Sequence, residues 1–176
     1  MVDLSVIPEC YVDTNLIETI VPPQIGYNHQ KGCGTVSNRM KGKLANAFAI
    51  GIIDKDKKHI DYLSEFEQVI QYGKLYLFKH KCKPHFIIQI SPAIERFILD
   101  NALACELKLT DYNLPETLSE LKKISKTVNS KKDLRFKRLF RDIMNKDSNE
   151  FRILASWIIY LKVHTYHADA NALKNL

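Results

Sequence analysis

The stretch Ala-Phe-Ala-Ile-Gly-Ile-Ile, residues 47–53, is apolar without interruption and is followed at once by Asp-Lys-Asp-Lys-Lys, residues 54–58. An apolar run of this length without alternation is typical of a strand covered on both faces, as in a parallel sheet. The charges then begin at the carboxyl end of the strand. This stretch predicts an α/β fold whose central strand ends in two acids.

The flanking sequence alternates shorter apolar runs with segments of helical spacing. Further strands are expected over residues 9–13, 75–78 and 86–90. Helices are expected over 15–20, 35–44, 62–72, 93–103, 115–124, 134–144 and 150–166. The order predicts a mostly parallel sheet flanked by helices, with a C-terminal helical extension. We expect residues 1–104 to form the α/β core and 105–176 to pack on it within one globular unit.

Composition excludes several protein classes. The chain has 176 residues, of which 45% are hydrophobic, with only 6 Gly and 6 Pro, so it is neither disordered nor collagen-like. Its 4 cysteines contain no CxxC pair, which argues against a disulfide scaffold and a structural zinc site. No apolar run approaches the ~20 residues of a membrane span, and the first residues do not resemble a signal peptide. We therefore expect a cytoplasmic protein with no membrane partner.

The net charge of +6 favours an anionic partner. Between Lys122 and Arg141 there are nine basic residues and one acid, a density suited to a nucleic-acid backbone. A solvated helix face is the alternative, and a protein partner or homodimer stays open. The candidate phosphate contacts are Lys79, Lys81, Lys83, Arg96, Lys131, Lys132, Arg135, Lys137 and Arg138.

Three aspartates are the candidate metal ligands. In an extended segment, Asp54 and Asp56 point the same way, and paired carboxylates are what Mg²⁺ or Mn²⁺ takes from a protein. Asp13 follows the first expected strand, so parallel neighbouring strands would bring it to the same edge. Such like charges would repel one another without a cation. The alternatives are a charged turn at residues 54–58 and helix capping by Asp13.

Four other side chains are weaker candidates. Glu95 lies near an expected helix start and could supply another carboxylate, and Glu9 and Glu18 could supply a further ligand or base. His29 lies in a polar loop, where it either positions a phosphate or water or is simply solvated.

The order of strand, acid, helix, glycine-bearing loop, helix and apolar strand ending in Asp-x-Asp resembles the Toprim domain over roughly residues 9–100. That family includes primases, topoisomerases, OLD-type nucleases and small ribosomal-RNA maturase nucleases. The resemblance implies a Mg²⁺-dependent nuclease in which Asp13 is the first acid and Asp54 and Asp56 are the pair, with Glu95 assisting. The chain departs from the family in having Asp13-Thr14 where Glu-Gly is usual. Residues 91–97 also resemble a helix start in Toprim-like phage-defence proteins.

Two other hypotheses remain open. The opening Tyr-Val-Asp-Thr-Asn-Leu, residues 11–16, resembles PIN-domain ribonucleases, and Leu109-Thr110-Asp111 resembles their late acid. The substitution at Asp13 also fits a non-catalytic Toprim-like module that binds nucleic acid or a protein.

Overall fold

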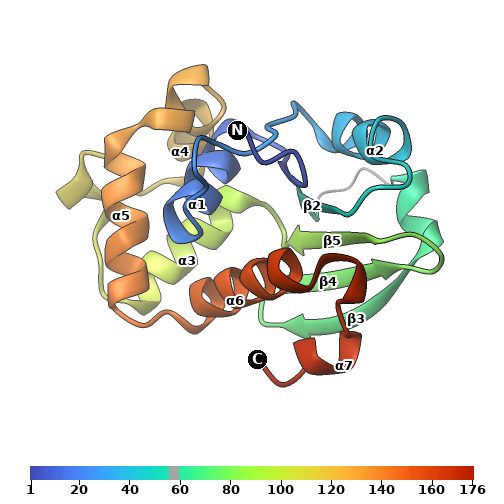
Figure 1. Ribbon diagram of the computed structural model, residues 1–176. Helices are drawn as coiled ribbons and strands as arrows, with labels where there is room; N and C mark the ends of the chain where they lie inside the picture. Colours follow the sequence, from blue (N-terminus) through green and yellow to red (C-terminus); the bar gives the residue numbers. More distant parts are fainter. Residues whose placement is uncertain (56–59) are drawn as a thin grey trace.

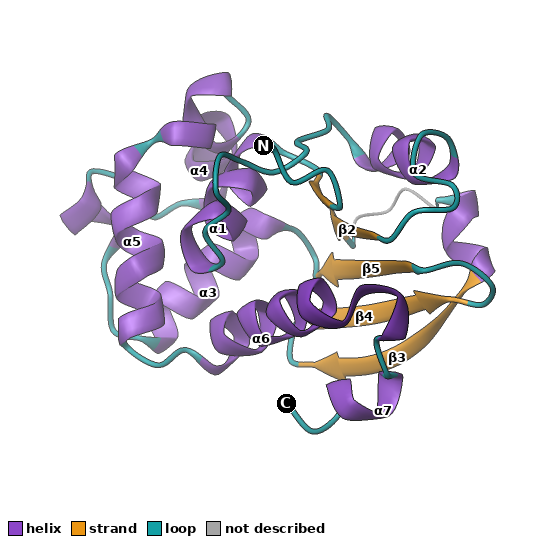
Figure 2. Ribbon diagram, viewed as in Figure 1, coloured by secondary structure: helices purple, strands orange, loops and turns teal. Residues whose placement is uncertain are grey.

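A mixed five-stranded sheet lies at the centre of the computed structural model, which describes residues 1–55 and 60–176 (Figures 1 and 2). The strand order is β1-β2-β5-β4-β3. The strands are β1 (Val6–Pro8), β2 (Ala49–Asp54), β3 (Phe66–Tyr72), β4 (Leu75–His80) and β5 (His85–Ile90). β1, β2 and β5 run parallel, whereas β4 and β3 are antiparallel to their neighbours. The expected mostly parallel sheet is therefore wrong in its second half, where short turns force the antiparallel direction.

Helices flank the sheet and make up the C-terminal part of the chain. They are α1 (Tyr11–Ile20), α2 (Cys33–Lys41), α3 (Ile94–Ala104), α4 (Leu118–Ser125), α5 (Leu134–Asn145), α6 (Asn149–His164) and α7 (Ala170–Leu173). Short 3₁₀ turns are η1 (Asp61–Glu65), η2 (Leu109–Tyr112), η3 (Val128–Lys132) and η4 (Thr165–His167). The helices expected after residue 93 are confirmed, with ends shifted by a few residues. Within the described ranges, no helix has the length and apolarity needed to cross a bilayer.

The two faces of the sheet carry separate hydrophobic clusters. On one face, Ile50, Ile52 and Phe86 pack with apolar side chains of α1, α3, α5 and α6. On the other face, residues of α2 and η1 cover the sheet. Here Gly51 is required, because a Cβ would stand 3.0 Å from Met40 Sδ and Val36 Cγ1. Burial on both faces explains why residues 47–53 read as a continuous apolar run.

The first strand lies earlier than expected. β1 ends at Pro8, and residues 11–13 belong to α1 instead of a strand. A capping box causes this, because the backbone amide of Cys10 donates to Asp13 Oδ2 at 3.0 Å and Cys10 Sγ accepts from the Asp13 amide at 3.4 Å. The alternative interpretation of Asp13 as a capping residue is thus confirmed.

The helix expected over residues 62–72 is wrong, because this segment forms η1 and then β3. A register shift between Gln68 and Ile70 breaks the alternation of β3. The resulting apolar spacing of Phe66, Val69 and Ile70 imitates a helix. Gly73, with φ of 52°, then turns the chain into β4.

Candidate functional site

Two acids meet where β1 and β2 end. Glu9 directly follows β1, and Asp54 is the last residue of the neighbouring parallel strand β2. The Asp54 amide donates to Glu9 Oε2 at 3.0 Å, and the Glu9 amide donates to the Ile52 carbonyl oxygen at 2.9 Å. The position at the end of the first strand that the sequence assigns to Asp13 is therefore held by Glu9.

Asp13 reaches the same region from the first turn of α1. Its side chain is only 1% exposed. Its Oδ2 accepts the Cys10 amide, whereas its buried Oδ1 has no hydrogen-bond donor among the residues the structure describes. A buried carboxylate oxygen without a donor is costly unless it is protonated or meets a cation.

The start of α3 contributes the fourth carboxylate. Glu95 is 4% exposed, and its Oε1 accepts a hydrogen bond from Ser125 Oγ at 2.6 Å. The amide of the preceding residue, Ile94, donates to Asp54 Oδ1 at 2.8 Å. Figure 1 shows why these elements meet: the arrowhead of β5 points toward α1 and α3, so the carboxyl ends of the parallel strands face these helices.

The crowding disturbs the titration of both aspartates. Burial, together with the charges of Glu9 and Glu95, raises the pKa of Asp13 to about 7 against the opposing effect of the Cys10 hydrogen bonds. Burial also raises the pKa of Asp54 to about 9, helped by the charges of Asp13, Glu9 and Glu95. Because like charges repel in a poorly solvated place, this cluster favours either a bound proton or a bound cation.

The described acids do not by themselves form a ligand set. Within residues 1–55 and 60–176, no three His, Cys, Asp or Glu side chains are arranged so that they could hold a metal ion. Asp56, expected to pair with Asp54, lies outside the described residues. Glu18 has a structural contact of its own. Its Oε1 accepts a hydrogen bond from the Tyr27 amide at 3.0 Å, which holds the segment around Tyr27 against α1.

The lysines of the β4–β5 connector lie away from the acids. Lys81 and Lys83 precede β5, whose first residue pairs with Ala49 at the amino end of β2. Lys79 pairs with Phe86 near the same end. Asp54 is at the other end of β2, and Figure 1 shows this turn on the side opposite α1 and α3. These lysines therefore lie at the end of the sheet opposite the acid cluster.

Arg96 is also engaged elsewhere. Its Nε lies 2.9 Å from Asp100 Oδ1, one turn along α3, and Lys74 pairs with the same carboxylate. The Arg96 side chain is half exposed, whereas its neighbour Glu95 is buried. Adjacent helical residues point about 100° apart, so the two side chains leave α3 in different directions.

Lys131 is a predicted phosphate contact on η3, a turn that packs against α1. It is close enough to His29 for its charge to lower the pKa of that side chain, although burial of His29 is the larger cause. His29 stacks on Tyr11 with ring centroids 4.4 Å apart. Thr14 Oγ donates its one proton to the Cys10 carbonyl, so it accepts from His29 Nδ1 at 2.9 Å. Neutral His29 therefore carries its proton on Nδ1. Because it is stacked on Tyr11 and bonded to Thr14, it differs from the freely solvated side chain of the alternative hypothesis.

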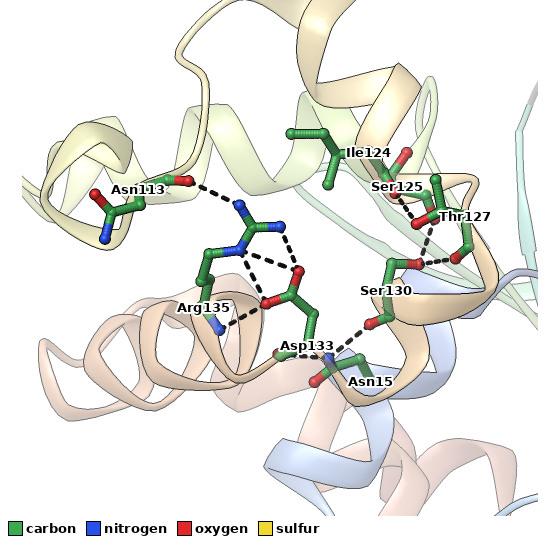
Figure 3. Close-up of polar contacts among 8 residues, drawn as sticks. All are labelled: Asn15, Asn113, Ile124, Ser125, Thr127, Ser130, Asp133 and Arg135. Atoms are coloured by element: carbon green, nitrogen blue, oxygen red, sulfur yellow. Dashed lines mark hydrogen bonds and ion pairs between the residues drawn. The ribbon is translucent and has the colours of Figure 1, made fainter.

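Arg135 supports the fold around η3 (Figure 3). Its guanidinium binds both carboxylate oxygens of Asp133, the N-cap of α5, and also the Asn113 carbonyl at 3.1 Å. Asn15 Nδ2 donates to the carbonyls of Ser130 at 2.8 Å and Asp133 at 3.0 Å. These contacts fix η3 against α1. Lys132 and Arg138 are exposed, and Lys137 is partly exposed on α5.

The histidines near the β4–β5 connector have structural hydrogen-bond partners. His80 Nδ1 accepts the amides of Cys82 and Lys83, and its Nε2 lies 3.0 Å from Glu65 Oε2. His85 Nδ1 lies 2.6 Å from the Tyr62 hydroxyl.

Comparisons with protein-family models, with curated proteins and with solved structures found no match to this chain. The geometry of the site therefore carries the functional argument.

Proposed function

We propose that this protein is a Mg²⁺- or Mn²⁺-dependent nuclease that cleaves phosphodiesters of DNA or RNA at the carboxyl ends of β1 and β2. One observation carries the proposal. Carboxylates from separate elements gather there, and the most buried of them, Asp13, has an oxygen without a donor in the described structure. The perturbed pKa values of Asp13 and Asp54 follow from the same crowding.

The arrangement changes the assignment of residues within the Toprim resemblance. Glu9, directly after β1, takes the place of the family's first acid, and it is a glutamate as the family usually has. Asp54 ends β2 and, with Asp56, remains the proposed acidic pair. Asp13 and Glu95, on α1 and α3, add negative charge beside the proposed pair.

The chain's own residues orient these oxygens. The Ile94 amide fixes Asp54 Oδ1, the Cys10 amide fixes Asp13 Oδ2, and Ser125 fixes Glu95 Oε1. A bound dication would supply Lewis-acid stabilisation and a water of lowered pKa. Lys131 and Lys132 on η3, near α1, are proposed to bind the phosphate backbone beside the acids. A role in phage defence rests only on the resemblance of residues 91–97.

Thermal unfolding with and without metal tests the proposal. At pH 8, Mg²⁺ or Mn²⁺ at ten times its Kd should stabilise the protein by about 1.4 kcal/mol, or about 3–6 °C in Tm. The Asp54→Asn variant should lose this response and any nuclease activity. Glu67→Gln, at an exposed position in β3, is the matched control and should keep both. No metal response in the wild type, or full activity in Asp54→Asn, would contradict the proposal.

A non-catalytic binding module is the second candidate. The observation favouring it is that Asp54, Asp13 and Glu95 each accept a hydrogen bond that fixes a helix, so each has a structural role without metal. The PIN-like alternative loses support because the Asn15 side chain is used to bind η3.

A further inference from the structure

A polar cavity of about 820 Å³ lies beside the acid cluster and shares Glu9 with it. One wall is the exposed side of α2, where Gly34, Asn38 and Lys41 recur at helical spacing. The opposite side of α2 carries Val36 and Met40, which pack on β2. The cavity therefore extends along the helix from the loop before α2 to its last residue.

We infer that this cavity, here called the α2 groove, holds a single nucleic-acid strand on one side of the phosphate to be cleaved. The inference rests on the proposed nuclease function, since it places the groove next to the metal-binding acids. It identifies the substrate as a strand whose backbone leaves the site along α2.

The lining of the groove suits a sugar-phosphate backbone better than an apolar ligand. Its polar residues include Thr35, Ser37 and Asn38. Tyr62 is almost fully buried and offers little surface for stacking a base. Lipophilic ligands need a largely apolar lining, which this groove lacks.

The lining of the α2 groove contains two lysines and two acids. Lys31 precedes α2 and Lys41 ends it, and the helix rises about 12 Å from Cys33 to Lys41, so the two lysines could contact different phosphates of one strand. Neither lysine has an acidic partner among residues 1–55 and 60–176. Glu9 and Asp61 are the acids of the lining. Glu9 belongs to the acid cluster. Lys31 and Lys41 are the positively charged residues of the lining, and we expect phosphates to bind beside them.

The α2 wall of the groove has room for a side chain at Gly34. A Cβ added at Gly34 would meet no atom of residues 1–55 and 60–176 within 4 Å, and Gly34 does not have a positive φ. A large side chain introduced at this position should therefore fill the groove without disturbing the fold. Gly32 is unsuitable for this purpose because its φ is 92°.

The test measures binding without cleavage. Fluorescence anisotropy in EDTA would follow labelled single-stranded DNA and RNA of about 12 nucleotides, a length within the usual range of single-strand sites. Gly34→Phe should weaken binding at least about tenfold without lowering Tm. Ser119→Phe is the control, because Ser119 is exposed and occupies the same second position of α4.

A charge test complements the steric one. Replacing Lys31 and Lys41 by Gln should weaken binding about tenfold and reduce the salt slope by up to about 2, since each lost phosphate contact lowers it by about 1. The control double variant, Lys146→Gln with Lys174→Gln, removes the same charge from α5 and α7 ends and should have a smaller effect.

The results separate this inference from the proposed function. Wild-type binding by Gly34→Phe, or equal losses in the two lysine pairs, would overturn the α2 groove while leaving metal-dependent cleavage untouched. Weaker binding by Gly34→Phe would support the groove even if no metal response or nuclease activity were found.

Discussion

The backbone amide of Asp54 donates a hydrogen bond to the carboxylate of Glu9, with 3.0 Å between nitrogen and Oε2. This contact joins the ends of two parallel strands through an acid of one and the backbone of the other. It places the Glu9 charge beside the Asp54 side chain, where it helps to raise the Asp54 pKa. The strand pairing that builds the sheet therefore also creates the electrostatic crowding of the site.

Removing the Asp54 charge should stabilise the metal-free protein. In the Asp54→Asn variant the amide oxygen can still accept from Ile94, while the buried charge and its repulsion from Glu9 are gone. At pH 9 and above in EDTA we expect a gain of at least about 1 kcal/mol, or about 2–4 °C in Tm. At pH 5 the gain should be smaller, because it vanishes only below about pH 4, where the carboxyl group is protonated in the unfolded chain as well. A variant that is less stable at both pH values would show that the carboxylate is needed for the fold.

The wild type should lose stability as the pH rises. The pKa of Asp13 is about 7 and that of Asp54 about 9 in the folded protein, against 3.8 for an ordinary aspartate. Between these values the folded state holds protons that the unfolded state has released, so unfolding becomes easier with rising pH. His29 and His85 have lowered pKa values and act oppositely below about pH 6.5, where the unfolded state binds the extra protons.

Melting curves in EDTA should therefore show a maximum of Tm near neutral or slightly acidic pH, with a decline above it. Mg²⁺ should reduce the alkaline decline, because it stabilises the ionised carboxylates. A Tm that rises steadily from pH 6 to 9 without metal would contradict the pKa shifts. Asp13→Asn should remove the Asp13 contribution to this pH dependence, which lies between about pH 4 and 7.

Local sequence patterns predicted the buried strand, its terminal acid and the later helices correctly, because both faces of β2 and one side of each helix are buried. They failed at residues 9–13, where the Cys10 and Asp13 side chains form a capping box that hydropathy does not reveal. They also failed at β3, where a bulge disguises the alternation. Asp13, Asp54 and Glu95 are candidates from the sequence that the fold brings to one region, whereas the sequence makes Glu9 only a weaker candidate because the strand before it has only three residues.

Asn15 should be important for stability through η3. Its side-chain amide donates to the carbonyls of Ser130 and Asp133, and Asn15→Ala would leave both without this donor (Figure 3). Buried polar groups without partners cost about 1–3 kcal/mol, so urea unfolding should show a loss of that size. Thr127→Ala, which removes an exposed hydroxyl that donates to the Ile124 carbonyl, should cost less than half as much. Equal losses would mean that Asn15 does not anchor η3.

Arg135 and Lys132 should behave differently although both belong to the same basic segment. Arg135→Gln breaks the contacts with Asp133 and Asn113 and should lower Tm, with little change in the salt dependence of oligonucleotide binding. Lys132→Gln should leave Tm unchanged and reduce the salt slope by about 1, because Lys132 is exposed on η3. Anisotropy titrations over a range of salt concentrations distinguish the two effects. The reverse pattern would place Arg135 in the nucleic-acid interface.

Gly73→Ala tests the β3–β4 hairpin that replaced the expected helix. The φ of 52° costs an L-residue about 1–2 kcal/mol, and the new Cβ would collide with the Glu150 carboxylate. That carboxylate accepts from the Lys74 amide at 2.6 Å and from Asn101 Nδ2 at 2.8 Å, so moving it would also disturb α3. We expect a loss of at least about 2 kcal/mol in urea unfolding.

Gly34→Ala is the control for this prediction, because its Cβ meets no atom and alanine favours the helix. It should be neutral or slightly stabilising. If Gly73→Ala were equally neutral, the left-handed turn at Gly73 and its close approach to Glu150 would be contradicted. If the hairpin is correct, the two glycine variants should differ in stability. Of the two, Gly73 has a left-handed backbone and lies against the Glu150 carboxylate, whereas Gly34 has neither feature.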